Sequence, residues 1–249
     1  MNQALETNHQ PQLHSISTSI LLHLLPGILI GAVYFALVQP VKDWGYPSIA
    51  ALNLAALLAL IPFQAGFLLL QQKRTGAPLF GGIIRYQQKI PWHQYLLWVP
   101  VIFVSSGMII SLLTPLSELL EGCFLWIPDI FRIDMGLSGG YSKQTLVITY
   151  LSSFLLVTLI GPLIEECYFR GYLLPRMPDM GGWTPLVHSA LFALYHTWTP
   201  WLAVSRTLAL LPLVCIVRWK KNLALGMIAH CLLNSIDIAI GVAFLLNIS

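Results

Sequence analysis

The sequence predicts an all-α membrane protein, a polytopic bundle of about seven transmembrane helices. Of its 249 residues, 57% are hydrophobic and only 9% are charged, and the mean hydropathy is +0.75. Soluble domains usually carry about 25% charged residues, so these few charges cannot cover the surface of a soluble protein of this size. The apolar residues form long runs without the period-two alternation of a membrane β-barrel, so a helical bundle is expected.

The apolar runs define the expected helices in chain order. A helix needs roughly 20 residues to cross the hydrocarbon core of a bilayer. The fifth and sixth runs are shorter than the others and are joined tightly, so we expect a helical hairpin there that does not fully cross. The seven runs are residues 16–38, 48–70, 95–114, 145–173, 183–199, 201–217 and 223–246.

The charges in the loops predict the orientation of the bundle. Loop 71–94 carries four basic residues and no acidic one, and loop 218–222 carries three and none. Loop 115–144 carries four acidic residues against two basic ones. Because cytoplasmic loops are enriched in Lys and Arg, the first two loops are expected in the cytoplasm. With seven spans, the N-terminus then lies inside and the C-terminus outside.

The chain reads as one continuous membrane domain without internal repeats. Residues 1–144 are expected to supply N-terminal helices and loops, and residues 145–246 a core that holds most of the unusual polar residues. The N-terminus lacks the basic region of a signal peptide, so we expect the first run to be a retained span. The four cysteines do not form a disulfide framework. No basic tract with interleaved aromatic residues indicates nucleic-acid binding.

Three of the expected spans contain polar side chains that are costly in a membrane. A charged residue at the centre of a span costs about 2.5–3.5 kcal/mol on insertion scales. From the helical rise, these side chains lie between ~12 and ~20 Å from the cytoplasmic ends of their helices. We therefore expect them to meet in one cavity inside the membrane. They are Glu165, Glu166 and Arg170 in EECYFRG, His196 in FALYH, and His230 and Asn234 in HCLLN.

Those residue types fit a hydrolysis reaction. Glu166 and Arg170 are four residues apart and can pair along one helix face, whereas Glu165 has no such local partner. A free carboxylate near a neutral imidazole can take a proton from water. A second imidazole and an amide can donate hydrogen bonds to a developing oxyanion.

At these residues the sequence resembles a known family. EECYFRG, FALYH and HCLLN are similar to the three motifs, EExxxR, FxxxH and HxxxN, of the type II CAAX prenyl endopeptidases, a family that includes the bacterial CPBP (Abi) proteins. The resemblance covers about residues 145–240. It implies that Glu165 and His196 activate water and that His230 and Asn234 form the oxyanion hole. Glu166 and Arg170 are then supporting residues.

The resemblance also implies a function. The chain is expected to be an intramembrane endopeptidase of the glutamic type that needs no cofactor. Its partners would be the lipid bilayer and a peptide or protein substrate, which in eukaryotic members of the family is prenylated and loses its last three residues. Resemblance to bacterial proteins places it in the bacterial cell membrane, with the active-site opening toward the cytoplasm.

Other functions remain open at this stage. Two histidines and a glutamate are a known catalytic zinc set, although HExxH is absent and the ligands would come from three helices. A non-catalytic immunity or scaffolding protein could keep the same fold, but its motifs would be degraded. A transporter could use buried acids and histidines, but no repeat of broken helices is visible.

Further polar residues in or near the spans carry expectations of their own. Arg206 and Asp237 are expected at similar depth on neighbouring helices, so we predict an ion pair that orients the last helix. In the alternative, Arg206 extends to the outer surface and Asp237 faces a water-filled gap. His188 is expected to be structural, and His23 to lie at the membrane interface.

Overall fold

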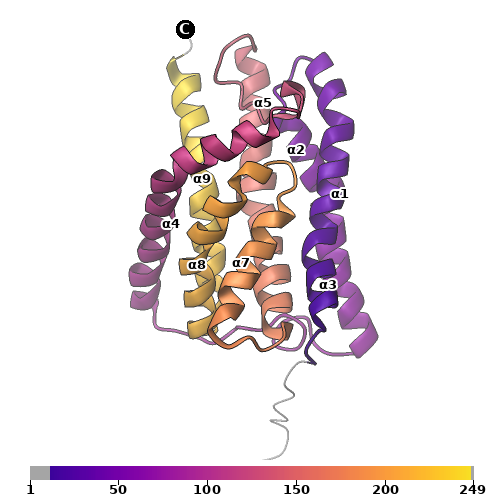
Figure 1. Ribbon diagram of the computed structural model, residues 1–249, viewed down its shortest axis with the longest axis vertical. Helices are drawn as coiled ribbons and strands as arrows, with labels where there is room; N and C mark the ends of the chain where they lie inside the picture. Colours follow the sequence, from indigo (N-terminus) through magenta and orange to yellow (C-terminus); the bar gives the residue numbers. More distant parts are fainter. Residues whose placement is uncertain (1–11, 248–249) are drawn as a thin grey trace, which may run out of the picture.

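The computed structural model describes residues 12–247, which form the expected all-α bundle (Figure 1). Within these residues, six helical segments are long and apolar enough to cross a membrane. Four are α1 (Ile16–Asp43), α4 (Trp92–Glu121), α8 (Ala203–Lys220) and α9 (Leu223–Asn247). One joins α2 (Ile49–Ala55), η1 (Ala56–Leu60) and α3 (Ile61–Thr75), and another joins α5 (Lys143–Ser153), η4 (Phe154–Ile160), α6 (Gly161–Glu165), η5 (Glu166–Leu173) and η6 (Leu174–Arg176). The chain is thus an integral, multi-pass membrane protein.

A seventh, shorter helix completes the bundle. Helix α7 (Thr184–Tyr195) has 12 residues, which span only about 18 Å at 1.5 Å per residue. It is joined to α8 by a short turn and η8 (Pro200–Leu202). The two helices form a hairpin whose turn lies below the upper end of the bundle in Figure 1. The sequence-based expectation of a hairpin that does not fully cross agrees with this length.

The two basic loops lie together at one end of the bundle, as the seven alternating segments require. The backbone N–H of Gln88 donates to the Lys221 carbonyl at 2.9 Å, and that of Leu223 donates to the Tyr86 carbonyl at 2.6 Å. The 122–142 loop lies at the opposite end (Figure 1). The positive-inside rule makes the basic end cytoplasmic, which stays a prediction.

Close packing of α1 holds the α7–α8 turn in place. A side chain at Gly27 would collide with the backbone carbonyl of Tyr195, so only glycine lets α1 approach the end of α7 this closely. The Thr197 hydroxyl then donates to the Gly27 carbonyl at 3.0 Å. Non-helical backbone is tolerated inside a membrane where protein groups satisfy it, and these contacts supply such groups.

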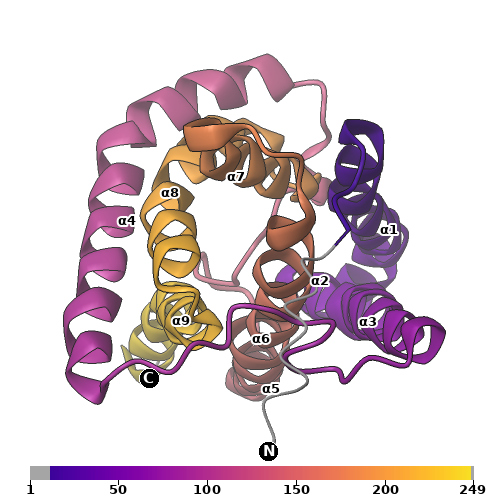
Figure 2. The ribbon, with the colours of Figure 1, turned by 90° about the horizontal axis from the view of Figure 1, so that it is seen from below.

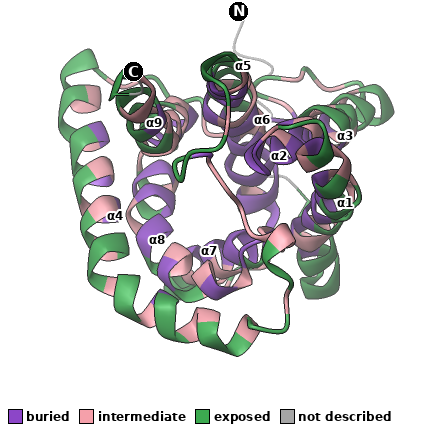
Figure 3. Ribbon diagram, turned by 90° about the horizontal axis from the view of Figure 1, so that it is seen from above, coloured by how far each residue is buried: buried purple, intermediate pink, exposed green. Residues whose placement is uncertain are grey.

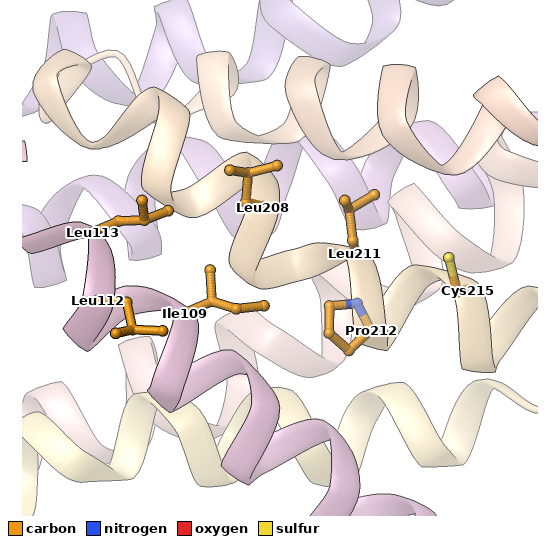
Figure 4. Close-up of a pocket in the computed structure, with 7 residues that line it drawn as sticks. All are labelled: Ile109, Leu112, Leu113, Leu208, Leu211, Pro212 and Cys215. Atoms are coloured by element: carbon orange, nitrogen blue, oxygen red, sulfur yellow. The ribbon is translucent and has the colours of Figure 1, made fainter. Parts of the chain in front are cut away.

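The outer surface of the bundle is apolar, and buried residues concentrate on the inner helices. Figure 3 shows mostly exposed residues along α4 and many buried ones along α6, α7 and α8. Between α4 and α8 lies an apolar groove of about 470 Å³ (Figure 4). No charged residue lines it, and we expect lipid chains to fill it. Its lining consists of Ile109, Leu112, Leu113, Leu208, Leu211, Pro212 and Cys215.

Candidate active site

The polar residues predicted from the three motifs come together inside the bundle. Glu165, His196 and Asn234 line one small cavity of about 60 Å³, together with apolar side chains from α1, α2, η1 and η4. His230 adjoins this cavity, because its Nε2 lies 3.7 Å from Glu165 Oε2. Figure 2 shows the helices that carry these residues, α6, α7 and α9, arranged around the centre of the bundle. The expected meeting of three helices is therefore present.

Glu165 is the last residue of α6, and its side chain is only 7% exposed. The Tyr195 hydroxyl donates a hydrogen bond of 2.9 Å to Glu165 Oε1. The side-chain amide of Gln64 in turn donates to the Tyr195 hydroxyl at 3.1 Å. Both Tyr195 and Gln64 are fully buried. This chain of two donors fixes one carboxylate oxygen and leaves Oε2 directed toward His230.

Tyr195 and Gln64 are site residues that the sequence analysis missed. Tyr195 stands directly before His196 in FALYH, and Gln64 is a lone amide inside the apolar run IPFQAGF. A buried amide or phenol in a membrane span needs a hydrogen-bond partner. This need for a partner marks Tyr195 and Gln64 as candidate site residues in the sequence, but it does not identify the group that each one bonds.

Glu166 links the first motif to the third. Its Oε1 lies 3.2 Å from Arg170 Nη1 and 3.0 Å from His230 Nδ1. Since an ionised carboxylate can only accept, Nδ1 of His230 carries the hydrogen, and the bond fixes the orientation of the ring. The Arg170 guanidinium also lies over the Phe192 ring, 3.9 Å from its centroid. The expected Glu166–Arg170 pair is present, and it also positions His230.

The close approach of α9 to Glu166 depends on a glycine. A Cβ atom built on Gly226 would lie 2.5 Å from Glu166 Oε2 and 3.0 Å from Val217 Cγ2. Gly226 is one helical turn before His230 on the same helix. The absence of a side chain there lets His230 reach Glu166.

His196 lies just beyond the end of α7 rather than inside the helix that was expected over 183–199. Its backbone has φ −80° and ψ 63°. The last carbonyls of a helix lack helical partners, and the ring Nδ1 lies 2.9 Å from the Phe192 carbonyl oxygen. A carbonyl can only accept, so Nδ1 carries the hydrogen and Nε2 keeps its lone pair. This tautomer suits a group that accepts a proton.

Asn234 lines the cavity but already makes one hydrogen bond. Its Nδ2 donates to the Val157 carbonyl at 3.0 Å, which leaves the second N–H of the amide for another acceptor. Val157 belongs to η4, one of three π-helical segments in the described chain. Such segments are rare and frequent at functional sites. Residues of η1 and η4 line the cavity, and η5 begins directly after Glu165.

The predicted Arg206–Asp237 ion pair is wrong. Among the described residues, no ion pair includes either side chain; Arg206 Nη2 instead donates to Thr199 Oγ1 at 3.1 Å. Asp237 is exposed. Beyond Asn234, only Gly241 of α9 is buried. The C-terminal half of this helix therefore has little protein around it, and Asp237 lies on its exposed side.

Two helical histidines outside the three motifs form a buried pair. His23 Nε2 lies 3.0 Å from His188 Nδ1, and His23 Nδ1 lies 2.6 Å from the Ser19 carbonyl. His188 thus makes a structural contact, as expected. The start of α1 packs against η5 and buries His23 completely, while its expected depth at the membrane interface stays a prediction.

The zinc alternative has no preformed site in the structure. In residues 12–247, no three His, Cys, Asp or Glu side chains are grouped so that they could hold a metal ion. His230 Nδ1 and Glu166 Oε1 are bonded to each other.

Fold and site together define a multi-pass helical membrane protein with a buried carboxylate–imidazole centre. Residues 147–236 match the model of a protease family, Rce1-like type II CAAX prenyl endopeptidases. This match confirms the resemblance seen in the three motifs, all of which lie inside the matched segment. Comparisons with curated proteins and with solved structures found no match.

Proposed function

We propose that this protein is an intramembrane endopeptidase that hydrolyses a peptide bond of a membrane-associated protein or peptide. The observation that carries this proposal is the cavity shared by Glu165, His196 and Asn234, with His230 beside it. All four residues lie in the segment that matches a protease family. These four residues combine proton acceptors with hydrogen-bond donors around one small space.

In the proposed reaction, Glu165 acts as the base and His196 positions the water. Glu165 Oε2 takes a proton as the water oxygen bonds to the carbonyl carbon of the substrate. The unprotonated Nε2 of His196 accepts the other water hydrogen in a hydrogen bond. The protonated Glu165 then gives its proton to the amide nitrogen, the C–N bond breaks, and a carboxylic acid and an amine leave. This sequence follows general acid–base catalysis by one carboxyl group.

His230 and Asn234 would stabilise the oxyanion. Asn234 keeps one amide N–H free after bonding Val157. His230 has its Nδ1 3.0 Å from Glu166 Oε1, which fixes the ring, and its Nε2, 3.7 Å from Glu165 Oε2, would be the donor to the oxyanion. Preorganised donors of this kind often make the largest single contribution to catalysis. Glu166 and Arg170 hold His230 in place, and Tyr195 holds Glu165.

The substrate is proposed from the family alone. It would be a membrane-associated peptide or protein, with a lipid-modified one included, and the chain would act in the bacterial cell membrane with its opening toward the basic, cytoplasmic end. No cofactor is assigned to the reaction. A non-catalytic immunity or scaffolding role is the alternative that the experiment below separates from the enzyme.

The test is a comparison of membrane peptides from cells that carry the wild-type protein or Glu165→Gln. We expect a set of new N-termini and released peptides with the wild type that is absent with the variant. Glu118→Gln is the matched control, because Glu118 is exposed at the outer end of α4. Identical peptides in wild type and Glu165→Gln, with both proteins folded, would favour the non-catalytic alternative.

A further inference from the structure

Arg206 is a membrane-embedded cation with an unused hydrogen-bond donor. It belongs to α8, inside the span Pro200–Lys220. Its Nη2 donates to Thr199 Oγ1, but Nη1 is buried and has no hydrogen-bond partner among the described residues. An unsatisfied buried donor costs roughly 1–3 kcal/mol, and more when it is charged. The acid expected to balance it, Asp237, lies elsewhere and is exposed.

The contacts of Arg206 place it beside the catalytic centre. Thr199, which accepts its hydrogen bond, donates its own backbone N–H to the His196 carbonyl at 3.0 Å. The charge of Arg206 interacts with both Glu165 and His196. Leu208 of the apolar groove lies two residues further on, about 200° around the helix. Arg206 therefore faces the site, on the side of α8 away from that groove.

Two other arginines of the bundle have their charge balanced by acids of the chain. Arg170 pairs with Glu166 and lies over the Phe192 ring. Arg132 pairs with Glu121 and Asp129 at the outer end. Among the described residues, Arg206 hydrogen-bonds only the neutral Thr199 hydroxyl, and its attraction to Glu165 acts beyond ion-pair distance. An ionisable side chain within a membrane span that lacks a partner of its own is a functional-site candidate by default.

The guanidinium group indicates the chemistry of the missing ligand. Its planar fork of N–H donors matches the two oxygens of a carboxylate, and such bonds are among the strong hydrogen bonds of proteins. We propose that Arg206 binds a carboxylate of the peptide substrate close to the scissile bond. This inference rests on the proposed endopeptidase function. The carboxylate is either the C-terminus of the substrate or the side chain of an Asp or Glu near the cleaved bond.

Binding can be measured without turnover in the Glu165→Gln protein, purified in detergent. The probes are fluorescein-labelled peptide pools with four randomised C-terminal positions, made as free acids or as C-terminal amides, each with and without Asp and Glu. Fluorescence anisotropy gives the Kd for each pool. We expect carboxylate-containing pools to bind about tenfold tighter, as one charge-assisted hydrogen bond allows. A preference for free acids identifies the C-terminus, and a preference for pools with Asp and Glu identifies a side chain.

Variants of Arg206 then test the assignment. Arg206→Gln should abolish the preference, and Arg206→Lys, which keeps the charge but not the fork, should retain part of it. Arg218→Gln is the control on the same helix, since Arg218 donates only to the Gly181 carbonyl in the loop before α7. Thermal unfolding identifies any variant that does not fold. A preference that survives Arg206→Gln, or its absence in the parent protein, overturns the inference.

Cleavage of the same pools by the protein with Glu165 intact separates this inference from the proposed function. Cleavage that ignores the carboxylate refutes only the role of Arg206. Binding that depends on the carboxylate, without cleavage of any pool, refutes the endopeptidase and retains an anion site at Arg206. If the protein shows no preference for carboxylates and cleaves no pool, the role of Arg206 and the endopeptidase function are both refuted.

Discussion

Replacing Gly226 by alanine tests how tightly the third motif must pack against the first. The added methyl would lie 2.5 Å from Glu166 Oε2, 3.3 Å from Glu166 Cδ and 3.0 Å from Val217 Cγ2. Glu166 is fully buried between Arg170 and His230, so it has little room to move. Either α9 shifts outward or the carboxylate rotates, and both lengthen the 3.0 Å contact with His230 Nδ1.

The expected magnitude follows from overpacking. An extra methyl group in a packed interior typically costs about 1–3 kcal/mol. We expect Gly226→Ala to lower the thermal unfolding temperature in detergent and to reduce the release of membrane peptides by about tenfold or more, if ~1.4 kcal/mol of transition-state stabilisation is lost. The peptide assay measures the reduced release of membrane peptides, with Glu165→Gln as the inactive reference.

Gly107→Ala is the matched control for this substitution. Gly107 lies in α4, and a Cβ there would meet no heavy atom within 4 Å. Alanine has the higher helix propensity, by about 1 kcal/mol, so this variant should keep wild-type activity and stability or gain slightly. Wild-type behaviour of Gly226→Ala itself would refute the packing of α9 against Glu166 and the positioning of His230 derived from it.

Three further predictions concern the same site. Glu165→Gln should abolish peptide release while the unfolding temperature stays near that of the wild type. Glu166→Gln should lower both peptide release and the unfolding temperature, because it leaves Arg170 without its carboxylate. Equal instability of the two variants would contradict these roles. Tyr195→Phe should lower kcat about fivefold with KM unchanged, as the loss of ~1 kcal/mol implies. Adding Gln64→Leu to this variant should lower kcat little further, because the Gln64 amide acts through the Tyr195 hydroxyl. Fully additive losses of the two substitutions would argue against this chain of hydrogen bonds. Activity should survive 1,10-phenanthroline, and the purified protein should contain no stoichiometric zinc; inactivation by the chelator and recovery with added zinc would establish a metal enzyme instead.

The sequence predicts the membrane bundle and the meeting of the polar side chains of the three motifs, because both predictions depend on patterns along single helices. The cost of charge in lipid made Glu165 and His230 conspicuous. The i,i+4 spacing predicted the Glu166–Arg170 pair, which the structure contains. Whether these residues act in catalysis as proposed is a prediction that only the variants can test.

The details that the sequence does not predict depend on contacts between distant segments. Tyr195 and Gln64 are 131 residues apart, and neither belongs to a recognisable pattern. The depth and rotation expected for each polar side chain hold only for regular α-helices. In the structure, η4 and η5 are π-helical and α7 ends before His196. For Asp237, matching depth was not enough, because nothing in the periodicity shows that α9 loses its neighbours beyond Asn234.

The short length of α7 has a consequence for how the protein enters the membrane during synthesis. A 12-residue helix is too short to be recognised as a separate crossing segment, so α7 and α8 should insert together, as a hairpin pushed in from the basic end. The polar turn then halts inside the hydrocarbon, where Thr197 needs the Gly27 carbonyl. Because α1 is made first, this carbonyl is already in the bilayer when the hairpin arrives. Order of synthesis and stability of the turn are thus coupled, and a chain in which Gly27 is replaced by a larger residue should stall at this insertion step.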